Sequence, residues 1–469
     1  MDVFRVMILE LEKLDWDGDV TAGLPVTGKI NGMDVTVEAN GDVTVTEGTL
    51  SDEEDDKPKT LATLKTSEEP VEGNTTLEDT NGDSITIPDG FNIDKDSPIV
   101  VEEGIVIEDS EENQYVWIPV FEKNEERTWG ADYATAGVVT AKTAERTSFT
   151  TADYTAIQTA LKTYTNTYKK TNFSDVWYGD ENYGQYGYYN GEDFIYYTNG
   201  DMSENEYNTL YQNMLVSVYK NGGFYIGRYE MGTGVATSLE SAESLTREAM
   251  TEYTASTATG GTTVEEKGAP SIQGMPTPVS KANAVGYTWI TQSQAQMLAE
   301  KMGEEYGYGN TTSSLMFGVQ WDAVCVFLEK CGTLSDGTEF DSSYLIGHDK
   351  GKLWGNYKNS TYTMDRGFYN IYTSTSPYIL KENWNEKTSK TASGSWLCTT
   401  GASDQNSALN IYDFGGNLYE FTLERYSNSF TPVTDRGGYF GVSYSASFRT
   451  EPYTYYSSSY HSARPTLWL

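Results

Sequence analysis

The chain has 469 residues, and its 69 acidic residues outnumber the 32 basic ones to give a formal net charge of −37. This balance argues against a nucleic-acid partner, because binding nucleic acid depends on clustered Lys and Arg that displace counterions. The three cysteines are too few for a disulfide framework, and their spacings match no zinc pattern. No apolar run is long enough for direct membrane insertion, so we expect none.

The N-terminal region predicts a small, separate segment. Residues 1–14 form a short amphipathic stretch without the pattern of a signal peptide. Residues 34–38 and 43–46 alternate around Asn40-Gly41, which predicts a β-hairpin. Residues 51–59 are acidic and contain a proline, which is typical of a linker. We therefore expect a helix plus hairpin over 1–50 and a linker over 51–59.

A β-rich connecting segment is expected over 60–103. Strands are predicted at 84–87, 99–101, 104–107 and 115–120. The acidic stretch 79–83 superficially resembles a calcium loop. Its glycine stands at the fourth position instead of the sixth, so we interpret the stretch as a hairpin turn. The stretch Asp15–Asp19 fails the same test and is also assigned to a turn.

Residues 104–469 are expected to form one α+β domain with insertions at about 121–221 and 232–274. Helical spacing predicts helices over 151–163, 204–219, 291–302 and 314–329. Thr291 and Gln294 are placed to form a capping box. Residues 177–197 are rich in Tyr and Gly, and two interpretations stay open. They are either a ligand platform or a loop that packs onto its own domain.

The last fifty-odd residues carry the most informative pattern. Asp413–Thr422 contains two glycines, 436–438 reads Arg-Gly-Gly, and a Tyr/Ser-rich run then leads to Arg464. In that run, 13 of the 24 residues from 439 to 462 are Tyr or Ser. Tyr offers a large, rigid, amphipathic contact area, and Ser adds adaptable hydrogen bonds. The composition is that of a binding surface, and the alternative is a pair of solvated strands in a Tyr-rich protein.

These motifs resemble the C-terminal signature of the C-type-lectin-like fold of formylglycine-generating enzymes (sulfatase-modifying factor type), and most closely the variable proteins of diversity-generating retroelements. The family usually reads Gly-Asn-Val-Trp-Glu-Trp where 416–421 reads Gly-Asn-Leu-Tyr-Glu-Phe. The family's closing Gly-Phe-Arg is Ser-Ala-Arg at 462–464, which is a larger departure. The resemblance implies an α+β fold with a C-type lectin domain that carries insertions and follows small β-rich N-terminal segments.

Residue types suggest how such a scaffold is held. Gly415 and Gly416 permit a tight turn with positive φ, and Glu420 points away from its aromatic neighbours on the same strand. We expect Glu420 to be braced by Arg436 or Arg464. The alternative is calcium bound by Asn417 and Glu420, although two oxygen donors do not make a calcium cage. The expected scaffold residues are Asn417, Glu420, Arg436, Gly437, Gly438, Phe448 and Arg464, with Phe448 as the core aromatic of the run.

The sequence lacks the residues that enzymes of this resemblance need. The copper-dependent family members use a cysteine pair in the C-terminal core, but no cysteine follows Cys398. The iron-dependent relatives need several histidines, and this chain has only His348 and His461. No Gly-x-Ser-x-Gly elbow stands near a usable histidine. We therefore expect no catalytic activity and no cofactor.

The resemblance implies a non-catalytic display protein whose C-terminal surface is diversified by adenine-directed mutagenesis. The partner would be a protein or carbohydrate ligand on a cell or virion surface, which suggests a cell-surface, secreted or phage-virion location. The first alternative is a fixed-specificity adhesin or phage receptor-binding protein. The second is an enzyme similar to the formylglycine-generating ones, or a degenerate relative of them with a structural role. The expected ligand-binding residues are Tyr439, Phe440, Ser443, Tyr444, Ser445, Tyr453, Tyr455, Tyr456, Ser458, Tyr460 and His461.

Overall fold

The computed structural model divides the chain into two compact units, residues 1–59 and 60–469. It describes residues 26–30, 33–37, 43–46, 59–67, 69–138, 148–179, 186–238, 240–242, 244–245, 269–371, 380–382, 388–391 and 394–469. The stretches 1–14 and 15–19 and nearly all of the predicted linker lie outside these residues.

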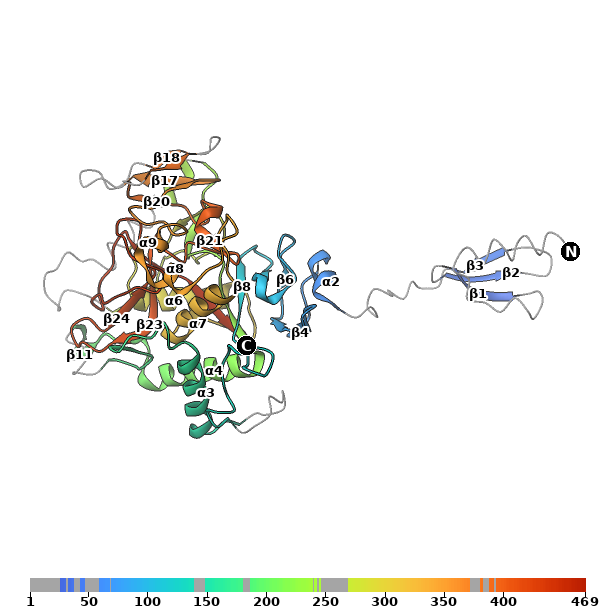
Figure 1. The fold of residues 1–469 in the computed structure, drawn as a ribbon, viewed down its shortest axis with the longest axis horizontal. Coiled ribbons are helices and arrows are strands. Elements are labelled where there is room, and N and C mark those ends of the chain that lie inside the picture. Colours follow the sequence, from blue (N-terminus) through green and yellow to red (C-terminus); the bar gives the residue numbers. More distant parts are fainter. Residues whose placement is uncertain are drawn as a thin grey trace. The chain divides into compact units, whose positions relative to one another are not determined.

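The first unit contains an antiparallel three-stranded sheet (Figure 1). Its strands are β1 (Val26–Ile30), β2 (Met33–Val37) and β3 (Val43–Thr46). Strands β2 and β3 pair with Val37 opposite Val43, which confirms the predicted hairpin. Strand β1 was not predicted.

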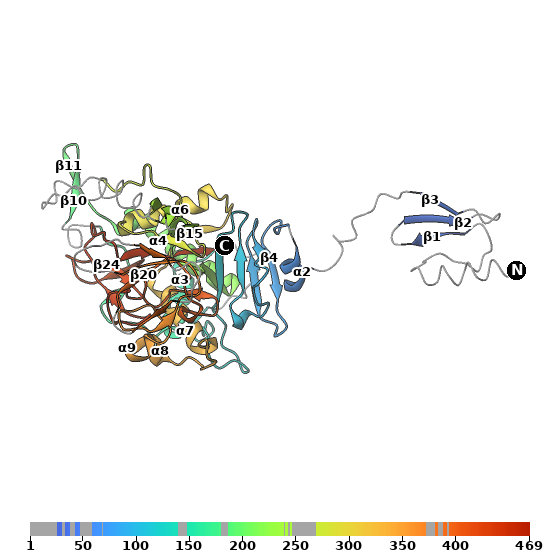
Figure 2. The same cartoon turned by 90° about the horizontal axis from the view of Figure 1, so that it is seen from above.

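The second unit contains both helices and strands (Figure 2). It is built on a six-stranded antiparallel sheet of order β15-β27-β12-β8-β7-β6. The strands are β6 (Asn92–Ile93), β7 (Val106–Glu108), β8 (Gln114–Pro119), β12 (Gly223–Gly227), β15 (Thr312–Leu315) and β27 (Pro465–Trp468). The last strand of the chain thus lies between β12 and β15. Residues from both ends of the second unit share this sheet, so 60–103 is part of the same compact unit.

An insertion separates two neighbouring strands of this sheet. Strands β8 and β12 pair directly, with Ile118 opposite Phe224, although 103 residues lie between Pro119 and Gly223. The insertion carries α3 (Thr151–Tyr164), α4 (Glu204–Asn221), η3 (Asn199–Asp201), β9 (Phe173–Ser174), β10 (Gly187–Asn190) and β11 (Asp193–Tyr196). Helices α3 and α4 match the predicted helices, and a capping box starts each of them.

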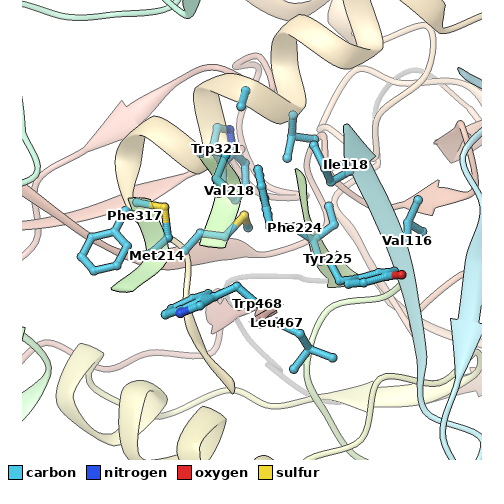
Figure 3. Close-up of a cluster of buried hydrophobic side chains, with 14 of the residues drawn as sticks. Val116, Ile118, Met214, Val218, Phe224, Tyr225, Phe317, Trp321, Leu467 and Trp468 are labelled. Atoms are coloured by element: carbon cyan, nitrogen blue, oxygen red, sulfur yellow. The ribbon is translucent and has the colours of Figure 1, made fainter. Parts of the chain in front are cut away.

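The main core lies where α4 and α7 (Gly318–Cys331) cover the sheet (Figure 3). Met214 and Val218 of α4 contribute to one hydrophobic cluster with Phe224 of β12, Trp321 of α7 and Trp468 of β27. Each of these side chains is at most 2% exposed. Burying large apolar groups of this kind stabilises the fold by about 1.5–3 kcal/mol per side chain before entropy is counted.

A second sheet forms from the C-terminal residues. Its strands are β23 (Tyr419–Tyr426), β24 (Val433–Arg436), β25 (Arg449–Thr450) and β26 (His461–Ala463), and β9 pairs with the far end of β23. Strand β26 runs parallel to β23, with Glu420 opposite Ser462. A parallel pair needs a crossover, and the Tyr/Ser-rich run supplies most of it.

Short elements complete the second unit. They are α2 (Leu61–Thr66), β4 (Thr75–Glu78), β5 (Ser84–Ile87), η2 (Val101–Glu103), β13 (Gly232–Val235), β14 (Ala284–Gly286), α6 (Gln292–Glu305), α8 (Ser342–Ile346), α9 (His348–Gly351), β16 (Tyr362–Thr363), β17 (Phe368–Ile371), β18 (Leu380–Glu382), β19 (Ser389–Lys390), β20 (Trp396–Cys398), η5 (Asp404–Asn406), β21 (Ser407–Ala408) and β22 (Ile411–Tyr412). The predicted turn at 79–83 joins β4 and β5, and Asp79 Oδ1 accepts from the amides of Asn81 and Asp83. Thr291 and Gln294 form the predicted capping box of α6.

Two predictions of secondary structure were wrong. Residues 99–101 lead into the 3₁₀ turn η2 instead of forming a strand. The predicted helix over 314–329 begins only at Gly318, because Thr312–Leu315 pairs with the C-terminal strand. The Asp175 carboxylate then accepts from the amides of Gly318 and Val319 at 2.6 and 3.1 Å. The acceptor that starts this helix therefore comes from a distant segment.

Among the residues that the structure describes, no helix has the length and apolar character needed to cross a membrane.

Candidate ligand-binding face of the C-terminal sheet

The turn before β23 depends on two residues with left-handed backbone. Gly416 has φ +85° and Asn417 has φ +57°. A Cβ on Gly416 would lie 2.3 Å from the carbonyl oxygen of Asn356, so only glycine fits there. Gly415 was expected to share this conformation but does not have positive φ. The left-handed pair is instead Gly416 and Asn417, and Asn tolerates this region better than most residues.

The Asn417 side chain ties this turn to three other segments. Its Oδ1 accepts from the Asn356 side chain and from the Cys398 amide, each at 3.0 Å. Its Nδ2 donates to Glu230 at 2.6 Å. Because every polar atom of this buried amide is used inside the protein, Asn417 positions β23 and has no oxygen directed to solvent.

Glu420 is paired with Arg464, one of the two arginines expected for it. Arg464 reaches both Glu420 oxygens at 2.7–3.2 Å and also donates to the carbonyl oxygens of Gly227 and Tyr412. Both side chains are at most 1% exposed. This bidentate pair fastens β23 to the segment that leads into β27. The alternative calcium role would require Glu420 to give up this contact.

Three buried carboxyls surround the single guanidinium of Arg464. Burial and then the neighbouring Asp413 carboxylate raise the pKa of Glu230 well above its ordinary value. Burial raises the pKa of Asp413 to about 6, against the opposing effects of the Gly401 amide and Arg464. Burial also raises the pKa of Glu420, with Arg464 opposing it. The cluster therefore favours holding protons over full ionisation.

The second buried network joins β24, β25, β23 and α7. Arg436 contacts Asp322 at 2.6 Å and Glu424 at 3.1 Å, and Arg449 contacts the same two carboxylates at 2.8 and 2.9 Å. The two guanidiniums and two carboxylates balance in charge, and all four residues are at most 6% exposed. Arg436 therefore braces the sheet against the helix and does not pair with Glu420.

The glycines after Arg436 start the Tyr/Ser-rich run. Gly437 and Gly438 have φ of +84° and +78°. A Cβ on Gly438 would come within 3.0 Å of Tyr357 and Tyr444 ring or side-chain carbons. The expected scaffold role of this Arg-Gly-Gly motif thus has a steric basis, because the chain reverses there next to packed rings.

A group of aromatic rings gathers at the N-terminal end of β23, and we call it the Tyr419 cluster. Tyr419 lies 5.0 Å from Tyr439, 6.4 Å from Tyr460 and 6.5 Å from Tyr444, measured between ring centroids. Tyr439 and Tyr460 stack at 4.7 Å. The run therefore folds back over β23 as a layer of partly exposed rings.

The predicted contact residues fall into three groups by the exposure of their side chains. Tyr453 is 38% exposed. Partly buried side chains are Tyr439, Ser443, Tyr444, Tyr455, Tyr456 and Tyr460. Buried side chains are Phe440, Ser445, Ser458 and His461. The last four differ from the expectation of surface contact residues, since a ligand could not reach them without a rearrangement.

The two phenylalanines of the run have exchanged their expected places. Phe440 is 2% exposed, whereas Phe448 is only partly buried and stacks on Tyr444 at a centroid distance of 3.7 Å. Phe440 comes directly after the Gly-Gly reversal, and its amide donates to the Asn417 carbonyl oxygen at 3.0 Å. That hydrogen bond holds the start of the run against the scaffold turn, which sequence alone does not reveal.

His461 is a buried connector below the rings. Its Nδ1 lies 2.7 Å from the Ser458 hydroxyl. Its Nε2 lies 2.7 Å from Asp435 Oδ2, a contact at ion-pair distance without the alignment of a hydrogen bond. The ring stacks on Tyr419 and Phe421 at 5.2 Å. His461 therefore connects β26 to β24 beneath the layer of tyrosine rings.

Burial raises the pKa of all three cysteine thiols. Burial raises the pKa of the Cys398 thiol to about 12, although its contact with the Tyr362 hydroxyl opposes this. Burial likewise raises the pKa of Cys325 and Cys331. Thiols of this kind are poor nucleophiles and poor metal ligands. Within the described residues, no group of three or more His, Cys, Asp or Glu is placed to hold a metal ion.

Comparisons with known proteins add little to this description. No family model matches the chain, and no curated protein matches it. Among solved structures, a chain titled "Crystal Structure of CarF" is similar over 53% of this chain and 87% of its own length, with 14% identity and a TM-score of 0.22.

Proposed function

We propose that the chain is a non-catalytic ligand-binding protein with a C-type-lectin-like domain, and that it acts as the variable protein of a diversity-generating retroelement. The observation that carries the proposal is the layered C-terminal sheet. Partly exposed tyrosines of the run lie over a scaffold whose signature residues are buried. Asn417, Glu420, Arg436 and Arg464 are each at most 1% exposed.

A surface whose residues are diversified needs positions that tolerate substitution above a scaffold that stays unchanged. Substitutions at partly exposed rings remove little packing, whereas the strands below are held by buried charge pairs. The last strand, β27, returns to the middle of the main sheet, so the run is anchored on both sides. A binding surface held by a rigid sheet keeps its shape while its side chains change.

A peptide-selection experiment tests the binding function. Binders are selected from a random peptide library on the immobilised chain, and their affinities are measured for the wild type and a Tyr444→Ser/Tyr460→Ser variant. We expect a loss of about thirtyfold or more, because tyrosine anchors commonly contribute roughly 2 kcal/mol each.

The matched control is Tyr154→Ser/Tyr426→Ser, which removes two partly buried tyrosines outside the run. Melting temperatures of both variants show whether the fold is retained. Equal affinity in all three proteins, or an equal loss in both variants, would contradict binding through the run.

A genomic observation tests diversification. A near-identical copy of the coding segment for the run, beside a reverse transcriptase gene and differing only where the copy has adenine, is expected. Its absence would assign the protein to the fixed-specificity adhesins or phage receptor-binding proteins.

A further inference from the structure

A second group of rings joins the Tyr/Ser-rich run to the insertion. Tyr453 and Tyr455 stack at a centroid distance of 5.4 Å with ring planes 10° apart. Tyr186, which comes directly before β10, meets them edge-on at 5.5 and 4.9 Å. Two segments that are far apart in the sequence therefore share one aromatic cluster, and the insertion borders the proposed binding face.

The hairpin β10–β11 that follows Tyr186 is unusually aromatic for an isolated pair of strands. It forms a two-stranded sheet of its own, with Tyr189 opposite Phe194. Tyr189 is 54% and Ile195 is 37% exposed. Figures 1 and 2 both place the hairpin at the side of the unit that carries β24. Because Tyr189 shares a face with Phe194, it lies on the opposite face from Ile195, so each face of the hairpin presents one exposed apolar side chain.

The two segments that meet in this aromatic cluster contain acidic residues and no basic ones. Residues 186–201 and 450–463 contain Glu192, Asp193, Asp201 and Glu451 and no Lys or Arg. None of these four carboxylates forms an ion pair with another described residue. Burial and then the Asp435 carboxylate raise the pKa of Glu451, and burial and then Glu206 raise the pKa of Asp201. In both cases burial is the larger cause of the raised pKa, and the neighbouring charge that adds to it is a carboxylate.

The other end of the run has a different character. There the amide of Lys358 donates to the Val442 carbonyl oxygen at 2.9 Å, and Lys358 itself is exposed. The unbalanced acidic character is therefore a property of the hairpin end, not of the whole Tyr/Ser-rich run.

We propose that hairpin β10–β11 and residues 451–456 form one contact surface for a partner that presents clustered arginine and lysine side chains. Tyrosine rings offer faces for cation–π contacts, and guanidinium groups add stacking and bidentate hydrogen bonds to carboxylates. The inference rests on the proposed binding function and states which partner chemistry this end of the surface takes.

A labelled octa-arginine peptide serves as the probe, with octa-glutamate as the negative probe, and binding is followed by fluorescence anisotropy. The site variant is Glu192→Gln/Asp193→Asn/Glu451→Gln. Its dissociation constant for octa-arginine should rise about tenfold, since each exposed ion pair contributes modestly and the three act together. The aromatic variant Tyr189→Ser/Tyr453→Ser should weaken binding as well, with its charge unchanged.

The charge-matched control is Glu111→Gln/Glu125→Gln/Glu126→Gln, three exposed carboxylates beside β8 and in the segment that follows it. It removes the same formal charge and should change binding less than about twofold. Equal losses in the site and control variants would show that binding follows net charge alone, and would overturn the inference.

The two proposals can fail separately. In one outcome, library-selected peptides bind Tyr444→Ser/Tyr460→Ser more weakly, but the site variant binds octa-arginine as tightly as the wild type. The binding function then stands and this inference falls. In the opposite outcome, the site variant binds octa-arginine more weakly, but Tyr444→Ser/Tyr460→Ser binds the selected peptides with unchanged affinity. The cation-binding surface then stands without the proposed function.

Discussion

The two layers of the C-terminal sheet differ in how their polar groups are satisfied. Below, the buried side chains of Arg436, Arg449, Asp322 and Glu424 bond to one another. Above, the hydroxyls of Tyr456 and Tyr460 bond to each other at 2.5 Å in a partly exposed layer. Breaking a buried network leaves uncompensated charge, whereas changing a partly exposed ring leaves a group that water can solvate. Substitutions in the buried network should therefore lower stability more than substitutions in the partly exposed ring layer.

The largest effect is expected in the buried network. Arg436→Met should lower the free energy of unfolding by about 3–5 kcal/mol, because Asp322 and Glu424 would keep only Arg449 as a counter-ion. Urea unfolding measures the change. The exposed pair Lys350–Asp341 provides the contrast, and Lys350→Gln should shift stability by less than about 1 kcal/mol. Similar losses in both variants would remove the distinction between the layers.

A smaller effect should separate the two phenylalanines of the run. Phe440→Ala should cost about 3 kcal/mol or more, as expected for a buried aromatic, and Phe448→Ala about half as much. Thermal or urea unfolding of the two single variants decides the order. The reverse order would mean that Phe448, as its sequence context suggested, is the core residue.

The exchanged burial of Phe440 and Phe448 shows that the sequence did not predict the orientation of individual side chains in the run. The family-like motif located the scaffold residues Asn417, Glu420, Arg436 and Arg464, because tight turns and buried ion pairs need particular residue types. Composition located the Tyr/Ser-rich run but not the orientation of each side chain. Phe440 and His461 are buried through contacts with Asn417, in the turn before β23, and with Asp435 of β24. Likewise, the cap on α7 comes from Asp175, so local pattern placed that helix start too early.

The pH dependence of stability should sharpen the contrast through Asp413. Burial raises its pKa to about 6, above the value of about 3.9 expected in the unfolded chain. The folded state thus binds more protons between these values, and stability should fall as the pH rises from about 4 to 6. The part due to Asp413 is on the order of 3 kcal/mol at most.

Asp413→Asn tests this directly. Asn tolerates the positive φ of +57° at this position and keeps an oxygen for the Gly401 amide. The variant should lose part of the downward slope between pH 4 and 6 in thermal melts. An unchanged slope would show that Glu230 or Glu420 carries the proton uptake instead.

The smallest stability effect is expected for Tyr453→Ser at the exposed end of the run. The ring is 38% exposed, and its stacking on Tyr455 is worth about 0.5–1.5 kcal/mol. Since Tyr186 still meets Tyr455 edge-on after the change, part of that contact energy is retained, and the unfolding free energy should fall by less than about 1 kcal/mol. Urea unfolding of the variant beside Phe440→Ala measures both layers under one condition. A loss for Tyr453→Ser as large as that for Phe440→Ala would mean that the hairpin end of the run is packed as core. In that case the ring cluster would support the insertion, and it could not be available to a ligand.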